Sequence, residues 1–513
     1  MSTLLVVERI EDWPLGVPGV RVVAARDYLT GNDAGTDASG AGPASERLGT
    51  GRHRVFNLCR SYRYQSLGYY VSLLAEARGH RPLPNVGTIQ DLKSRSLVRL
   101  VSEDVGDLVQ RSLAPLASDT FTLSIYFSRN LAKRYRRLAL ALFNLFPAPL
   151  LRAQFVRRGT EWQLSSLRPI AAKDIPPEHQ AFVVQAAVDH FARPRSGAPR
   201  RAAWRHDLAI LVDPEEKEPP SDERALQRFE RAARRLGVRT ERFTRDDFGR
   251  LAELDALFLR TTTRVDDYTY RFSRRATAEG LVVIDDPDSI VRCTNKVYLA
   301  ELLTRGKVPM PRTVVAHRDN LEGVAAELGF PCILKLPDSS FSQGVVRVED
   351  LEGFEQRARA FLGESELLIA QEFLPTGFDW RVGVLAGEVL YACKYHMARA
   401  HWQIIKRDRR GQARSGRVEA LPCAEVPAAV LDTALAATRL IGEGLYGVDL
   451  KEVDGRVYVI EVNDNPSLDA GYEDAVEGGT LYRRLAEVFV QRIEARKTGT
   501  GGSASPVGAG SLP

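Results

Sequence analysis

Two β-strands joined by a tight turn are predicted by one stretch late in the chain, Val448-Asp449-Leu450-Lys451-Glu452-Val453-Asp454-Gly455-Arg456-Val457-Tyr458-Val459-Ile460-Glu461-Val462-Asn463. The turn falls at Asp454-Gly455, a dipeptide that readily adopts the left-handed conformations a hairpin requires. Glu461 and Asn463 are two positions apart on the second strand, so their side chains share one face. The strand that leads into them is otherwise apolar, which favours a site over separately solvated side chains.

The register of this hairpin decides whether Asp449 joins them. A two-residue turn leaves Asp449 opposite Ile460, on the other face of the ribbon. A three-residue loop, with Gly455 in the left-handed conformation, pairs Asp449 with Val459 instead, and the three oxygen-bearing side chains then converge. We expect this second register, because two carboxylates and an amide are hard oxygen donors that suit Mg²⁺.

A single lysine interrupts the apolar run at residues 331–337. A buried ammonium without a partner is costly, so Lys335 either meets an anion or extends to solvent from an edge strand. The loop that follows, residues 338–344, offers hydroxyl and backbone N–H groups suited to phosphate oxygens. Its candidate phosphate-binding residues are Ser339, Ser340, Ser342 and Gly344.

A second lysine lies at a predicted helix start, residues 293–300, with Thr294 as the expected N-cap. Lys296 in the first helical turn opposes the helix dipole, unless helix and lysine share a phosphate. The alternative is an exposed lysine with a small energetic cost.

Residues 367–374 read as a strand that leads to Pro375, a hinge whose backbone groups suit the edge of an adenine. Asp379 and Arg381 then share one face of the next strand, residues 379–385. Lys394 ends the following apolar run, residues 389–393.

Two other patterns are rejected as sites. Residues 442–447 match G-x-G-x-x-G, but a predicted helix precedes them and a strand follows, the reverse of a dinucleotide site. His396 and His401 lack the spacing of a zinc motif, and we expect structural roles for both.

Composition limits the class of protein. The chain has 513 residues, enough for about three domains. Its net charge is +5, with 44% hydrophobic residues, which excludes wholesale disorder and a dedicated nucleic-acid binder. Five scattered cysteines argue against a disulfide framework. The N-terminus lacks a secretory pattern, and residues 138–151 are too short to span a membrane, so we expect a cytoplasmic protein without a membrane partner.

The chain is expected to hold several α/β and α+β domains. Residues 30–51 read as a flexible loop, 193–201 as a linker and 491–513 as a disordered tail. Strands at 208–212, 238–243, 256–260 and 281–284 surround a helix at 223–236, which predicts parallel α/β layering. We expect a helix at 69–78 and find no internal repeat. The basic run at 129–137 reads as a solvated helix face, with an RNA or anionic-lipid surface as the alternative.

The ordered set of these motifs resembles an ATP-grasp domain, and within that superfamily the RimK-type carboxylate–amine ligases, which add glutamate to a ribosomal protein or to other acceptors. The residues that carry the resemblance are Lys296, Lys335 with its Ser/Gly loop, Gln371-Glu372-Phe373-Leu374, Asp379-x-Arg381, Lys394, Asp449 and Glu461-x-Asn463-x-Asn465-Pro466. The resemblance implies an N-terminal α/β extension at residues 1–195, a pre-ATP-grasp α/β domain at 204–290 and an α+β ATP-grasp domain at 291–490.

The resemblance also implies roles for these residues. ATP phosphates would be held by Lys296, Lys335 and the loop residues Ser339, Ser340, Ser342 and Gly344. The adenosine would be held by Gln371, Glu372, Phe373 and Asp379. Mg²⁺, with Mn²⁺ as an alternative, would be held by Asp449, Glu461 and Asn463. Catalysis would fall to Arg381, Lys394 and Asn465.

The activity implied is ATP-dependent activation of a carboxylate as an acyl phosphate, followed by attack of an amine. Glutamate would be the amino acid, and a peptide or protein the acceptor. Where RimK-type sequences carry an arginine-rich pattern, residues 402–407 here read Trp-Gln-Ile-Ile-Lys-Arg, with Lys406 or Arg407 as a replacement for the arginine. A nucleotide-binding regulatory protein with little turnover, and action on ribosomes through residues 129–137, are the competing hypotheses. The sequence leaves the oligomeric state open.

Overall fold

The computed structural model describes residues 2–13, 16–17, 19–30, 53–93, 105–191, 204–338, 344–398, 401–407 and 413–498. The expected loop at 30–51 and linker at 193–201 lie almost entirely outside these residues, as does the part of the expected tail that follows Thr498. Residues 491–498 are helical, so the expectation of a disordered tail from residue 491 was wrong for this part. The chain forms two compact units. Unit 1 holds residues 1–206 and 245–254, and unit 2 holds residues 207–244 and 255–513. No helix in the described part of the chain has the length and apolar character needed to cross a membrane.

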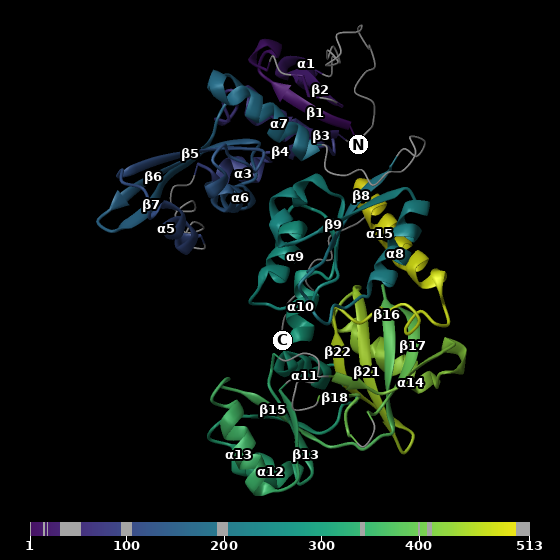
Figure 1. The fold of residues 1–513 in the computed structure, drawn as a ribbon. Helices are drawn as coiled ribbons and strands as arrows, with labels where there is room; N and C mark the ends of the chain where they lie inside the picture. Colours follow the sequence, from purple (N-terminus) through teal and green to yellow (C-terminus); the bar gives the residue numbers. More distant parts are fainter. Residues whose placement is uncertain are drawn as a thin grey trace, which may run out of the picture. The chain divides into compact units, whose positions relative to one another are not determined.

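Unit 1 begins with a four-stranded parallel sheet of order β2-β1-β3-β4 (Figure 1). Its strands are β1 (Ser2–Val7), β2 (Val20–Ala24), β3 (His53–Asn57) and β4 (Arg81–Leu83). One face packs on α1 (Ala25–Thr30) and α2 (Leu67–Ala77), through alternate residues such as Val6 and Val55. α2 confirms the helix expected at 69–78, and Gly79 follows it in the left-handed conformation. A short helix, α3 (Val86–Asp91), follows β4.

The other face of that sheet shares a core with a three-stranded antiparallel sheet, β5 (Thr120–Tyr126), β6 (Leu150–Arg158) and β7 (Glu161–Pro169). The helices of this part are α5 (Gly106–Leu113), α6 (Arg136–Leu145) and α7 (Gln180–Phe191). The basic run at 129–137 lies before and within the first turn of α6, and its arginines and lysine are largely exposed while Tyr135 is buried. This arrangement is the one expected of a solvated helix start.

Unit 2 begins with a second parallel sheet, of order β11-β10-β8-β9. Its elements are β8 (His206–Leu211), α8 (Glu223–Arg235), β9 (Val238–Phe243), β10 (Ala256–Leu259), α9 (Tyr268–Ala278), β11 (Val282–Ile284) and α10 (Pro287–Thr294). These bounds confirm the four strands and the helix expected from the sequence within one or two residues. The last helix, α15 (Gly479–Thr498), packs here, with Phe489 against Phe258 at 5.5 Å between ring centroids.

A small sheet of order β12-β15-β13-β14 follows in the chain. It consists of β12 (Thr313–Ala316), β13 (Cys332–Lys335), β14 (Val345–Val348) and β15 (Leu368–Glu372), covered by α12 (Leu321–Leu328) and α13 (Leu351–Phe361). Leu334, Ala370 and Leu368 face these helices. Because strand residues alternate between faces, Lys335, Ile369 and Gln371 face the opposite side.

The larger antiparallel sheet of unit 2 has the order β20-β17-β16-β21-β22. Its strands are β16 (Phe378–Leu385), β17 (Glu388–His396), β20 (Val418–Leu421), β21 (Leu445–Val453) and β22 (Arg456–Asn463), and α14 (Ala428–Arg439) covers one face. β18 (Ile405–Arg407) and β19 (Ala413–Ser415) form a separate ribbon. A helix before and a strand after residues 442–447 confirm that this glycine pattern is not a dinucleotide site.

The hairpin β21–β22 corrects the expected register. Val453 pairs with Arg456, so the turn has two residues, Asp454 and Gly455, both with positive φ. The three-residue loop was therefore wrong. The expected convergence still arises, because a β-bulge shifts the register so that Leu450 pairs with Val459 while Asp449 pairs with Glu461. The extra residue re-aims the end of β22, as bulges beside functional sites do.

Candidate active site

Lys335 lies in the middle of a sheet. Its strand, β13, pairs with β15 on one side and β14 on the other, which excludes the edge-strand alternative. Its side chain is 8% exposed. Burial lowers the pKa of Lys335 to about 8, against the opposing effect of the Glu461 carboxylate. Such a buried cation is placed to meet an anionic group.

Lys296 is the first residue of α11 (Lys296–Arg305). The N-cap is Asn295, whose side chain accepts from the N–H groups of Val297 and Tyr298. The expectation of Thr294 as N-cap was wrong, since Thr294 ends α10 and its hydroxyl donates to the carbonyl of Ile290. A separate short helix therefore begins at Lys296, and its first turn carries the lysine.

The loop after Lys335 is attached to this helix start. Asn295 Nδ2 donates to Asp338 Oδ1 at 2.8 Å, and the Lys296 N–H donates to the Pro337 carbonyl at 3.0 Å. Gly344 closes the loop with φ of 71°, and its carbonyl accepts from the Leu336 N–H. Ser339, Ser340 and Ser342 lie outside the described residues.

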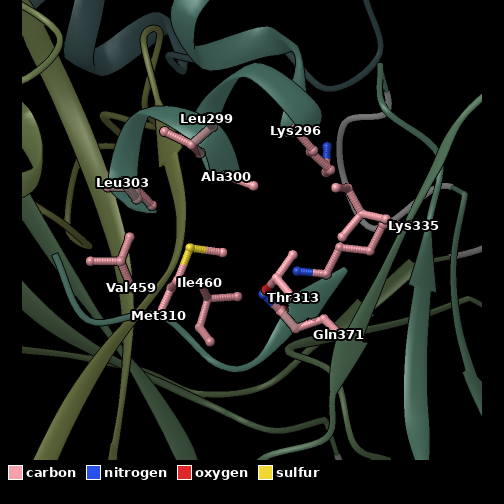
Figure 2. A pocket seen from close by; sticks show the side chains of 11 residues that line it. Lys296, Leu299, Ala300, Leu303, Met310, Thr313, Lys335, Gln371, Val459 and Ile460 are labelled. Carbon is pink, nitrogen blue, oxygen red and sulfur yellow. The ribbon is translucent and has the colours of Figure 1, made fainter. Parts of the chain in front are cut away.

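Both lysines line one pocket (Figure 2). Its walls come from α11, β12, β13, β15 and β22, so it lies between the small sheet and the larger sheet of unit 2. Apolar residues, among them Leu299, Met310 and Ile369, line it beside the two lysines. Gln371 lines it as well and donates to Thr313 Oγ1 at 2.8 Å. An apolar pocket with a few placed charges is the form of a small-molecule site.

The hinge residues after β15 are differently engaged. The Glu372 carboxylate bonds to Arg312, 3.1 Å from its Nε, and the Glu372 N–H donates to the Arg312 carbonyl. Phe373 packs under the Arg347 guanidinium, 4.2 Å from the ring centroid, and against Trp402 at 6.0 Å. Trp402 thus connects the altered segment at 402–407 to the hinge. The side chains of residues 405–407 lie outside the described part, so Lys406 and Arg407 have no described side-chain position.

The metal-ligand candidates come together at the bulge. Asp449 faces Glu461 in register, and Asn463 Nδ2 lies 3.5 Å from Asp449 Oδ2. Lys296 Nζ lies 3.1 Å from Glu461 Oε1. Burial alone would raise the pKa of Glu461, but the ammonium groups of Lys296 and Lys335 hold it below the ordinary value. Among the described residues no three His, Cys, Asp or Glu side chains form a metal cluster. The set here consists of two carboxylates and an amide.

Arg381 lies directly beside this set. Its guanidinium binds both oxygens of Asp449, with Nη2 at 2.8 Å from Oδ2, and stacks on the Tyr395 ring at 4.9 Å. Burial alone would lower the pKa of Arg381, but Asp449 keeps it raised. Asp379, two residues earlier, accepts from Lys451 Nζ at 2.5 Å. Lys451 was missed, although its spacing of two from Asp449 puts it on the same strand face.

Two expected catalytic residues are not in this group. Lys394 pairs with Trp380 in register, on the opposite face of β16 from Arg381, and its Nζ lies 4.9 Å from the rings of Phe378 and Trp380. Asn465 accepts from Arg260 Nη1 at 2.6 Å and donates to the Thr261 carbonyl at 2.7 Å. Asn465 therefore ties the segment after β22 to the parallel sheet.

Arg260 was also missed by the sequence analysis. It is 1% exposed and bonds to Ser221 Oγ, to Asn465 and to the carbonyls of Pro220 and Pro466. A single arginine after the apolar strand β10 is its only sequence signal.

Comparison with known proteins identifies the class that this geometry defines. Residues 293–476 match the model of the RimK-like ATP-grasp domain, and residues 43–186 match that of the RimK-like ATP-grasp N-terminal domain. The protein is thus an ATP-grasp enzyme, an ATP-dependent carboxylate–amine ligase. The chain therefore contains two regions that match domains of RimK-like ATP-grasp proteins.

Individual proteins are similar to parts of this chain. A probable alpha-L-glutamate ligase of Vibrio vulnificus (strain YJ016) is 29% identical over 239 residues, which cover 45% of this chain and 76% of the relative. A protein of the same name from Thioalkalivibrio sulfidiphilus is 28% identical over 256 residues, covering 49% of this chain and 81% of the relative. Among solved structures, the D-alanine–D-alanine ligase of Bacillus anthracis is 15% identical, with a TM-score of 0.47 over 58% of this chain and all of that one.

Proposed function

We propose that this ligase joins glutamate, through its amine, to a carboxylate on a peptide or protein acceptor. The observation that carries the proposal is the shared pocket of Lys296 and Lys335, with Glu461 bound to Lys296 at its border. Two cations beside a carboxylate set are what a metal-bound triphosphate requires. The names of the relatives support glutamate as the amino acid.

The donor set fits a magnesium ion. Asp449, Glu461 and Asn463 offer carboxylate and amide oxygens from adjacent positions on two paired strands, and Mg²⁺ prefers oxygen ligands completed by substrate phosphates. In our proposal these three side chains hold Mg²⁺, with Mn²⁺ as an alternative. The ion supplies charge neutralisation to the transferred phosphoryl group.

The chain's own residues have distinct tasks in this proposal. Lys296 and Lys335 bind the phosphates, while Gln371, Glu372 and Phe373 border the adenine and Asp379, held by Lys451, faces the ribose. Arg381 stabilises the oxygens of the acyl phosphate as charge develops on them. The apolar residues that line much of the pocket limit the access of water to this intermediate. We assign no chemical step to Lys394, and to Asn465 we assign positioning of the metal strand.

The test is ADP release from ATP in the presence of each amino acid and a candidate peptide acceptor, with mass spectrometry of the product. We expect release that needs both substrates and a product heavier by one or more glutamate residues. The Glu461→Gln protein is the control for contaminating activity. ATP binding without release under any pairing would contradict the proposal, and a product with a different amino acid would contradict its glutamate part.

A further inference from the structure

Unit 1 repeats the parallel sheet of unit 2. The orders β2-β1-β3-β4 and β9-β8-β10-β11 are the same, with the first strand in the interior and the second at one edge. The connection after the third strand matches in detail. Ser72 on α2 donates to the carbonyl of Pro84 at 2.7 Å, and Ser273 on α9 donates to that of Asp285 at 2.7 Å. The next residue caps the following helix in both, Asn85 in one and Asp286 in the other.

The antiparallel part is repeated as well. In unit 1 a strand, a helix, a hairpin and a helix follow one another as β5, α6, β6–β7 and α7. In unit 2 the same order is found for β16, α14, β21–β22 and α15, with β17 to β20 added between β16 and α14. The hairpin β6–β7 has a two-residue turn and then a bulge, because Phe155 pairs with Leu164 while Gln154 pairs with Ser166. The bulge lies at the same distance from the turn as in β21–β22. The sequence expectation of no internal repeat was therefore wrong at the level of structure.

The copy in unit 1 lacks the nucleotide half. Only residues 92–119 separate α3 from β5, whereas residues 295–377 separate α10 from β16 and form the small sheet that carries Lys335. This short connection has no room for four strands and their two helices. Within its described residues, unit 1 thus has a bulged hairpin like β21–β22 but no counterpart of the sheet formed by β12 to β15.

The hairpin β6–β7 carries different residues at the positions that correspond to the proposed metal ligands. Equivalent register puts Gln154 at the place of Asp449, Ser166 at that of Glu461 and Arg168 at that of Asn463. Ser166 Oγ donates to Gln154 Oε1 at 2.8 Å. Both carboxylates are gone and a cation has appeared, so this face suits an anion directly rather than one bridged by a metal.

Arg152 lies directly opposite Arg168 in the register of β6 and β7. Like charges opposite each other on paired strands destabilise a sheet unless an anion lies between them. Arg168 is exposed, and no acidic side chain in the described part of the chain pairs with it. Arg152 donates to the Asp174 carbonyl at 3.4 Å and to the Tyr126 hydroxyl, so its present partners are neutral groups. The only acidic residue on β5, β6 and β7 is Glu161, at the turn.

We propose that this face of the β5–β6–β7 sheet binds an acidic peptide segment, with Arg152 and Arg168 as the carboxylate-binding residues. Thr122, Ser124, Gln154 and Ser166 supply neutral hydrogen-bonding groups on the same face. Arginine binds carboxylates through paired hydrogen bonds. Tyr126 is the one aromatic residue of β5, β6 and β7 on this face, and it is buried with its hydroxyl bonded to His179. The face therefore offers no exposed ring on which a single-stranded nucleic acid could stack its bases. As an acceptor site, it rests on the proposed function, since added glutamates make the acceptor acidic.

The test measures fluorescence anisotropy of a labelled oligoglutamate peptide titrated with the full chain. We expect Arg168→Glu to weaken binding by roughly tenfold or more, since hydrogen bonds between charged groups are strong. Arg137→Glu, which makes the same charge change at an exposed position on α6, should leave binding unchanged. Arg152→Gln tests the second residue, and circular dichroism verifies that each variant is folded.

Three outcomes would overturn the inference. The first is an equal loss of peptide affinity in Arg168→Glu and Arg137→Glu. The second is a loss of peptide affinity in Lys335→Met but not in Arg168→Glu. The third is that oligouridylate binds more tightly than the peptide and that this binding depends on Arg168. The first means nonspecific charge, the second means binding in the ATP pocket, and the third means a nucleic-acid surface. Because this assay needs no turnover, Arg168-dependent peptide binding by a protein that releases no ADP would refute the proposed function while leaving this site standing.

Discussion

Lys296 and Glu461 form an ion pair, 3.1 Å from Nζ to Oε1, that joins the first turn of α11 to the end of β22. The other carboxylates of the site are paired in the same way, Asp449 with Arg381 and Asp379 with Lys451. Both carboxylates that we propose as metal ligands, Asp449 and Glu461, therefore already have a cationic neighbour. A metal ion held by these carboxylates would compete with their present cationic partners, and a phosphate would give those cations a new partner, so we expect the two to bind more tightly together than apart.

Glu461→Gln should abolish turnover in a folded protein. The change removes one proposed metal ligand and its charge, and we expect kcat to fall by roughly a hundredfold or more. Glu461 is a border residue of the pocket with a side chain 30% exposed, so the melting temperature should change little. Glu425→Gln, at an exposed position of unit 2, is the matched control. Unfolding of the Glu461→Gln protein by circular dichroism would assign this residue a structural role instead.

ATP binding should take up protons near pH 8. The pKa of Lys335 is lowered to about 8 by burial, so above that value the lysine is increasingly neutral. A phosphate beside it favours the ammonium form and raises its pKa again. Affinity for ATP should therefore fall as the pH rises through about 8. Calorimetry in buffers of different ionisation enthalpy measures this uptake. Lys335→Met should remove it and weaken binding, and an unchanged uptake in that variant would contradict the prediction.

Asn465→Ala should destabilise the protein more than it affects chemistry directly. The change leaves the buried Arg260 Nη1 without its acceptor, which costs about 1 to 3 kcal/mol. Asn465→Asp keeps an oxygen for Arg260 and should recover part of that loss in thermal unfolding. If the Asn465→Ala protein has the melting temperature of the parent protein but no turnover, the catalytic role expected from the sequence would be supported instead.

The free energy of unfolding of unit 1 should fall in acid because the buried carboxylate of Glu253 becomes protonated. Glu253 binds Arg54 at 3.2 Å and His190 at 3.1 Å. Burial alone would raise the pKa of Glu253, but His190, Arg250 and Arg54 hold it well below the ordinary value. Its contribution is present above the unfolded pKa of about 4.3 and is lost as the pH falls below it.

Glu253→Gln tests this contribution. At neutral pH it should cost about 3 kcal/mol, as expected for a broken buried pair, and it should flatten the acid dependence measured by calorimetry. Glu161→Gln, at the exposed turn of the same unit, should leave both unchanged. Equal acid dependence in Glu253→Gln and the parent chain would contradict the assignment.

Much of the fold follows from sequence patterns because local rules suffice for it. The strands β8, β9, β10 and β11 are short apolar runs between polar turns, and the order of motifs indicates the superfamily. Lys335 was found because a lone charge in an apolar strand needs a partner. The caps, by contrast, depend on one-residue choices. Thr294 and Asn295 both suit an N-cap by residue type, and in the structure Thr294 ends α10 while Asn295 caps α11.

The sequence predicted which residues come together in the site more accurately than it predicted the backbone geometry that brings them together. Asp449, Glu461 and Asn463 do converge, but through a bulge that no residue type signals, rather than through a wider turn. The face on which Lys394 lies depends on a bulge between Gly383 and Val384 in the hairpin β16–β17, and no residue type signals that bulge. The repeat escaped notice because the equivalent positions carry different residues, such as Gln154 for Asp449. Backbone hydrogen bonding preserves what side-chain identity does not.

The hairpins β6–β7 and β21–β22 have the same turn length and the same bulge position, so metal ligands could be transferred from the second hairpin to the first. The backbone of β6–β7 already places three positions as the metal-ligand positions of β21–β22 are placed. We therefore expect three cation ligands to form there, without any change in a loop, in the triple variant Gln154→Asp, Ser166→Glu and Arg168→Asn. If the triple variant binds manganese, its affinity measures what the bulged hairpin alone contributes to metal binding. The lysines, the nucleotide and the acceptor of the ATP site play no part in that measurement.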